Sequence, residues 1–311
     1  MTREGAGPDR VIWTDVAPRD GLQSWSGERV AADIRVRLVR GLLSAGVPRV
    51  EAAAFVSPRA VPQMADAAAL LKALGPEPRP RLRVLIPNLR GLELALASGV
   101  ENVVVTVGAT DGFNLRNVRR RVEDSLVELA EITVRARAAG CRVDVALSVA
   151  FGCPYEGRVD PARVAELGGR LVELGVTEVG VADTIGVATP RGVRELLAAV
   201  RQEVPLERLS CHFHDTRGLG VANVLAAHAA GVRRFDGSAG GIGGCPFAPR
   251  STGNVCSEDA LQALAAEGAE TGVDLAAYCE VSNRLARDLG VAELPGRLHR
   301  AGVWTASPQA G

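Results

Sequence analysis

The sequence lacks an excess of charge of either sign, a long apolar run and an apolar leader. Its 36 Lys and Arg balance 36 Asp and Glu, so bulk charge does not draw the chain to nucleic acid or to an anionic membrane. No window approaches the ~20 apolar residues that a membrane-spanning helix needs. The first ten residues contain acids and no apolar core, which argues against a secretory signal or a transit peptide. We expect a cytoplasmic protein with no nucleic-acid or membrane partner.

The sequence also lacks any Cys-X-X-Cys pair among its six cysteines, which disfavours a zinc ribbon and a thioredoxin-type site. A chain of 311 residues, 47% of them hydrophobic, can bury a sizeable core without disulfides. We therefore expect five cysteines to be packing thiols in a reducing compartment: Cys141, Cys153, Cys211, Cys256 and Cys279. Cys245 is the exception, because it lies in a glycine-rich stretch, 237–246, that predicts a loop.

Eight short apolar runs alternate with eight amphipathic stretches. The runs are rich in Val, Ile and Ala and mostly lack strict alternation, as is typical of strands buried on both faces. The predicted strands are 11–17, 49–55, 81–87, 101–107, 141–151, 177–184, 208–215 and 233–242. The predicted helices are 29–45, 60–74, 90–98, 119–139, 161–174, 190–203, 217–230 and 257–269.

This alternation predicts a (β/α)8 TIM barrel. A doubly wound open sheet is the alternative, but no Gly-X-Gly-X-X-Gly follows the first strand. We expect one domain over residues 1–311, with the barrel at about 10–270. Extra C-terminal helices should follow at about 271–300, and a flexible tail at 301–311.

Polar residues gather where the strands end, which is where TIM barrels carry their chemistry. His212 and His214 are two of only four histidines, and residues i and i+2 point to the same side of a strand. A lone histidine is more often structural, but this pair at the catalytic end indicates metal ligation. Arg19 and Asp20 follow the first strand; such a pair is usually a surface ion pair, yet here it can offer an oxygen ligand and a fixed cation.

Two histidines, an Asp carboxylate and the amide oxygen of Asn254 suit Mg²⁺ or Mn²⁺ better than structural zinc. Oxygen-rich sites with open positions favour these harder ions.

Seven segments resemble the 3-hydroxy-3-methylglutaryl-CoA lyase family of metal-dependent TIM-barrel lyases and synthases, in order over nearly the whole chain. They are VAPRDGLQ (16–23), VEAAAFVSPRAVPQMAD (50–66), VLIPNLRGLELALASG (84–99), FGCPYEGRV (151–159), VADTIGVATP (181–190), CHFHDTRGLGVAN (211–223) and GGIGGCPFAPRSTGNVCSED (240–259). The GGCP loop and FVSPRAVPQM are the most specific of these motifs.

The resemblance implies a retro-Claisen cleavage of 3-hydroxy-3-methylglutaryl-CoA to acetyl-CoA and acetoacetate, in a homodimer. By similarity, the divalent cation is bound by Asp20, His212, His214 and Asn254. It also implies four catalytic residues: Arg19, Asp20, His212 and Cys245. Asp20 would be the base, Arg19 would stabilise the enolate, and Cys245 would be the acid, since a thiol with a pKa of ~8.5 is mostly protonated at neutral pH. Four further residues match positions at or behind the site: Gln23, Glu51, Asp183 and Glu258.

The match departs at the fifth strand, where Asp144 and Ala146 stand in place of the family's Arg and Tyr. An acid there would oppose a carboxylate substrate unless a cation pairs with it. The arginines at 119–121 are candidates for that role, or else form a solvated first turn of a helix. The alternative function is therefore a related lyase or condensing enzyme on another acyl-CoA or 2-oxo acid, such as citramalyl-CoA. An inert binding barrel is less favoured, because no ligand is missing.

Overall fold

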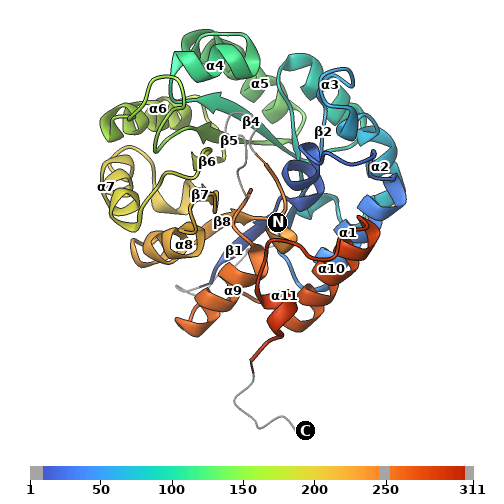
Figure 1. The fold of residues 1–311 in the computed structure, drawn as a ribbon. Helices are drawn as coiled ribbons and strands as arrows, with labels where there is room; N and C mark the ends of the chain where they lie inside the picture. The colour runs from blue at the N-terminus through green and yellow to red at the C-terminus, as the bar shows by residue number, and fades with distance from the viewer. Residues whose placement is uncertain (1–9, 245–252, 305–311) are drawn as a thin grey trace, which may run out of the picture.

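The computed structural model describes residues 10–244 and 253–304. Eight parallel strands form a closed barrel in chain order, viewed in Figure 1 through its open end. The strands are β1 (Ile12–Asp15), β2 (Arg49–Ala54), β3 (Leu82–Leu85), β4 (Asn102–Gly108), β5 (Arg142–Ser148), β6 (Glu178–Asp183), β7 (Leu209–Phe213) and β8 (Arg234–Gly237). Seven predicted ranges contain their strand, and the range 101–107 ends one residue before β4 does, so the TIM-barrel prediction is confirmed.

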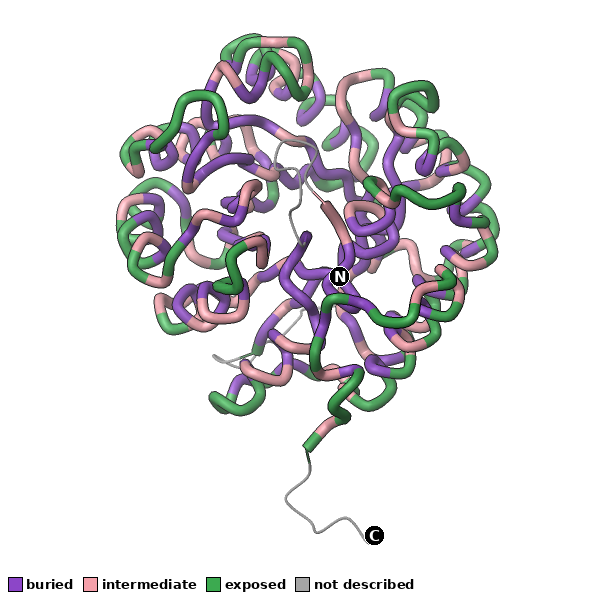
Figure 2. Tube along the Cα trace, in the orientation of Figure 1, coloured by how far each residue is buried: buried purple, intermediate pink, exposed green. Residues whose placement is uncertain are grey.

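Helices surround the barrel, with their buried faces toward the strands (Figure 2). They are α1 (Ala32–Ser44), α2 (Ala67–Leu74), α3 (Leu89–Ala97), α4 (Asp111–Val118), α5 (Val122–Ala138), α6 (Pro161–Glu173), α7 (Pro190–Val200), α8 (Gly220–Ala229) and α9 (Ser257–Ala266). The extra C-terminal helices are α10 (Leu275–Asp288) and α11 (Leu298–Ala301). No helix in the described ranges is long and apolar enough to cross a membrane.

Two helix predictions differ from the structure. The helix expected at 60–74 begins at Ala67, because Pro62 opens a separate 3-10 turn, Pro62–Met64. The helix expected at 119–139 begins at Val122 and is preceded by α4, whose first turn is capped by the Thr110 hydroxyl. Arg119 separates the two helices in a left-handed conformation, with φ 61°. The pattern hides α4 because Gly and Asn are poor helix formers.

A layer of charged side chains fills the barrel interior. Arg49 on β2 pairs with Glu178 on β6 at 2.9 Å, and Arg83 on β3 pairs with Asp236 on β8 at 2.8 Å. Asp144 on β5 lies 3.8 Å from both arginines. The suggestion that arginines 119–121 neutralise Asp144 is therefore wrong, because Arg120 and Arg121 pair instead with Glu128 and Asp111. The five cysteines expected to pack are all buried.

Candidate active site

The turn after β1 holds Arg19 and Asp20 at the mouth of the barrel. It is a π-helical turn, Ala17–Gly21, and π turns of this kind are frequent at functional sites. Arg19 donates from Nη1 to Asp20 Oδ1 at 2.5 Å, and its Nε donates to Glu51 on β2. The two carboxylates therefore fix the guanidinium in one orientation.

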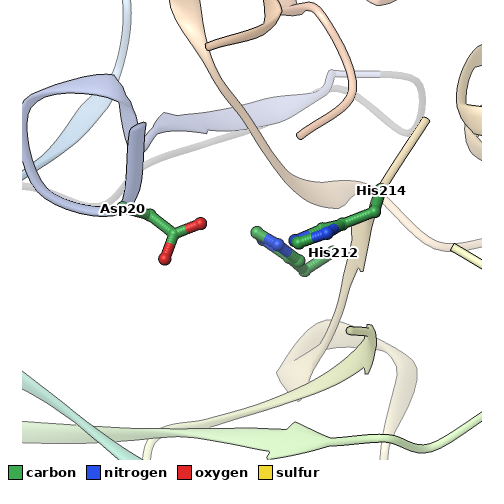
Figure 3. Close-up of side chains that lie close together, drawn as sticks. All are labelled: Asp20, His212 and His214. Carbon is green, nitrogen blue, oxygen red and sulfur yellow. The ribbon is translucent and has the colours of Figure 1, made fainter. Parts of the chain in front are cut away.

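His212 and His214 lie opposite Asp20, as Figure 3 shows. His212 is in β7 and His214 directly follows it. Ligand atoms of the three residues all lie within 4.8 Å of one another, and the imidazole centroids are 5.2 Å apart. The predicted convergence of the two histidines and Asp20 is therefore observed.

Asn254 completes the group from the loop after β8. A backbone bridge pairs it with His214, and its Nδ2 donates to Asp20 Oδ2 at 2.9 Å and to the Ile242 carbonyl at 3.2 Å. Its Oδ1 and the Nδ1 of His214 are buried and have no hydrogen-bond partner in the described parts of the chain. Such atoms are costly unless an ion or water satisfies them. The donor set therefore fits a divalent cation.

The protonation states of His214 and Asp20 also favour a cation. For His212, in contrast, burial lowers the pKa, but the carboxylates of Asp236 and Asp20 outweigh burial and the net pKa is raised. Burial lowers the pKa of His214 to about 4, helped by the nearby His212, so its ring is neutral at pH 7. Burial raises the pKa of Asp20, but Arg19 and the two histidines outweigh this effect and the net pKa is lowered. Neutral imidazole and carboxylate are the forms that bind metals.

A series of ion pairs connects this site to the charged layer in the barrel interior. Glu51 receives Arg83 Nε at 2.7 Å as well as Arg19, and Asp236, which pairs with Arg83, lies 3.7 Å from His212 Nδ1. Arg83 and Asp236 were not among the residues predicted for the site. Each is a charged residue inside a predicted strand, and that placement was the signal that could have pointed to it.

The remaining predicted residues are not in the cluster itself. Asp183 ends β6 and accepts the backbone N–H groups of Val187 and Ala188 at 2.8 and 3.0 Å. Glu258 is fully buried and accepts the Gly240 N–H at 3.1 Å. Both carboxylates thus hold loops at the barrel mouth. Gln23 follows the π turn with its Oε1 buried and without a partner among the described residues. Cys245 lies outside the described residues.

Comparison with known proteins decides the family. A family model described as HMGL-like matches residues 10–285. The chain belongs to the HMGL-like family. It is 40% identical to (R)-citramalyl-CoA lyase of Chloroflexus aurantiacus over 94% of this chain and 95% of that protein. It is 42% identical to mitochondrial hydroxymethylglutaryl-CoA lyase of Bos taurus over 90% of this chain and 88% of that protein.

Solved structures of the HMGL-like family agree. The crystal structure of hydroxymethylglutaryl-CoA lyase from Pseudomonas aeruginosa matches with a TM-score of 0.90 and 41% identity, covering 94% of this chain and 97% of that one. The family and these relatives establish a carbon–carbon lyase. Relatives at similar identity are named for two different acyl-CoA substrates.

Proposed function

We propose that this enzyme is a Mg²⁺- or Mn²⁺-dependent lyase that cleaves 3-hydroxy-3-methylglutaryl-CoA to acetyl-CoA and acetoacetate. The observation that carries the proposal is the convergence of Asp20, His212, His214 and Asn254 at the barrel mouth, with two buried ligand atoms left unpaired. When bound, the cation would hold the C3 hydroxyl and lower its pKa. Side chains of the protein carry out the proton transfers and stabilise the negative charge that develops.

Asp20 is the proposed base, because it lies in the ligand cluster beside the expected position of the hydroxyl. It takes the C3 hydroxyl proton, the hydroxyl oxygen forms the carbonyl, and the C2–C3 bond breaks. The electron pair of that bond moves onto C2 and the thioester as an enolate. Arg19 is held by Asp20 and Glu51, so its guanidinium can face the developing negative charge without reorganising.

Cys245 is the proposed acid that returns a proton to C2 and so completes acetyl-CoA. Its support is its place in the GGCP segment and a thiol pKa that keeps it protonated at neutral pH. Gln23, next to the π turn, is the proposed polar contact to substrate, because its buried Oε1 lacks a partner among the described residues.

The fifth strand supports a second candidate substrate, citramalyl-CoA, whose cleavage gives acetyl-CoA and pyruvate. Asp144 lies in the buried charge layer near Arg49 and Arg83, so cations of the protein itself offset its negative charge. Those arginines also form ion pairs with Glu178, Glu51 and Asp236. Among the described residues, no free arginine extends from this layer toward the carboxylate that both thioesters carry. The second candidate rests instead on Asp144 and Ala146, which depart from the family's pattern, and on a relative of equal similarity that is a citramalyl-CoA lyase.

The test follows acetyl-CoA release from each of the two thioesters, with and without Mg²⁺ or Mn²⁺. We expect metal-dependent cleavage that Cys245→Ala reduces by at least about 100-fold, within the range for general acid catalysis. Cys141→Ala is the matched control, because Cys141 is a buried thiol just before β5, at the barrel end opposite the site. Its activity should equal that of the wild type.

Preference for one thioester decides between the two substrates. Cleavage of neither, by protein that binds the metal, would show that the substrate assignment is wrong. Cleavage that is insensitive to chelation would contradict the metal-dependent reaction itself.

We also propose a homodimer, for which the family resemblance is the support. Light scattering of the purified enzyme at several concentrations tests it, and a mass of one chain throughout would contradict it.

A further inference from the structure

The helix α10 lies outside the barrel, beside α1 (Figure 1), yet one of its side chains reaches the end of β1. Tyr278 is fully buried, and its hydroxyl donates to Asp15 Oδ2. The same oxygen accepts the Ser257 hydroxyl at 2.8 Å, and Ser257 in turn accepts Trp13 Nε1 at 3.0 Å. Three elements of the chain thus meet on one buried carboxylate.

Asp15 connects this network to the π turn. Its other oxygen, Oδ1, accepts the backbone N–H of Ala17 at 2.9 Å, and Ala17 is the first residue of the turn that carries Arg19 and Asp20. Tyr278 and Ser257 therefore fix the carboxylate that holds the start of this turn.

The C-terminal segment also contacts the loop after β8. The Gly296 N–H donates to the Gly240 carbonyl at 2.8 Å, while the Gly240 N–H is held by Glu258 at the start of α9. Two residues further along, the Ile242 carbonyl accepts Asn254 Nδ2. This second loop packs directly on the first, because a Cβ on Gly21 would lie 2.7 Å from the Ile242 side chain.

From these contacts we infer that the segment beyond the barrel is part of the active-site framework, and that Tyr278 is a positioning residue acting through Asp15. It holds the loop that supplies Asp20 in register with the loop that supplies Asn254. The inference rests on the proposed metal site. Residues that orient metal ligands from outside the coordination sphere typically change affinity or activity 10–100-fold when mutated.

The test measures Mn²⁺ affinity by calorimetric titration, which needs no substrate. Tyr278→Phe removes only the donor hydroxyl, and we expect Mn²⁺ binding to weaken about tenfold, at the low end of that range. Ser257→Ala should act in the same direction. Thr133→Val is the matched control, since it removes a buried hydroxyl on α5 that bonds only within its own helix. Its Mn²⁺ affinity should equal that of the wild type.

A double-mutant cycle tests whether Tyr278 acts through Asp15. In an Asp15→Asn background, Tyr278→Phe should weaken Mn²⁺ binding by less than threefold, because residues in one network are not additive. A full additional tenfold loss would show that Tyr278 acts by another route. Unchanged Mn²⁺ affinity in Tyr278→Phe, with a wild type that binds, would overturn the inference.

Hydrogen exchange of the metal-free protein separates this inference from the proposed function. The Ala17 and Gly21 amides are bonded to Asp15 and to the Val16 carbonyl, and both should exchange faster in Tyr278→Phe but not in Thr133→Val. A wild type that binds no Mn²⁺ would contradict the proposed metal site, whereas the exchange rates would still report on the contact. Unchanged exchange at both amides would overturn the inference on its own.

Discussion

Asp20 and Glu258 are both carboxylates at the barrel mouth, but their surroundings move their pKa values in opposite directions. Burial raises the pKa of Asp20, and the charges of Arg19, His212 and His214 more than reverse this effect. Burial raises the pKa of Glu258 to about 7, and its hydrogen bonds offset only part of that rise. Asp20 is therefore ionised and suited to a cation, while Glu258 titrates close to neutral pH.

The pKa of Glu258 predicts a pH dependence of stability. Between pH 4.5 and about 7, Glu258 keeps a proton in the folded state that it releases in the unfolded state. Its contribution to the free energy of unfolding therefore falls as pH rises through this range and is constant above it. The predicted loss is about 3 kcal/mol. Glu258→Gln cannot ionise, so its stability relative to the wild type should improve by about this amount from pH 4.5 to pH 8. Urea unfolding at both pH values measures it; a constant difference would contradict it.

The strands β2, β3 and β8 are joined by one buried arginine. Arg83 bonds Glu51 at 2.7 Å and Asp236 at 2.8 Å, and its side chain is 4% exposed. Arg83→Met should lower the free energy of unfolding by about 3–5 kcal/mol, because Asp236 would be buried without its closest cation and Glu51 would keep only Arg19. Arg191→Met breaks an exposed ion pair with Glu195 and should leave the free energy of unfolding nearly unchanged, because solvent screens such a pair. Similar losses in the two variants would contradict a structural role for the interior layer.

The strands could be predicted because short apolar runs and helical patterns alternate, and the local period of the pattern needs no tertiary information. His212 and His214 were found by the same local geometry, since their spacing of two fixes their common side. Arg83, Asp236 and Glu51 meet only through the closure of the barrel and the registers of β8, β1, β2 and β3, which a local pattern does not contain. The link from Tyr278 to Asp15 spans 263 positions and depends on how α10 packs, so it too could be found only in the structure.

Barrel closure brings the turn after β1 and the loop after β8 together at the site. β1 pairs with β8, so Asp20 from the start of the chain bonds Asn254 from near its end. A ligand that binds only the folded state adds stability to the whole molecule. Metal binding should therefore raise the unfolding temperature of the entire chain.

The size of this shift is predictable. At 100 times the dissociation constant, Mn²⁺ should add about 2.7 kcal/mol, or roughly 5 °C for a chain of this length. His214→Ala removes a ligand whose Nδ1 has no other partner in the described residues, so its melting temperature should not respond to Mn²⁺. His228→Ala, on α8 away from the cluster, should respond like the wild type. If Mn²⁺ raised the melting temperature of His214→Ala as much as that of the wild type, the ion would bind elsewhere. Barrel closure would then not be what assembles its ligands.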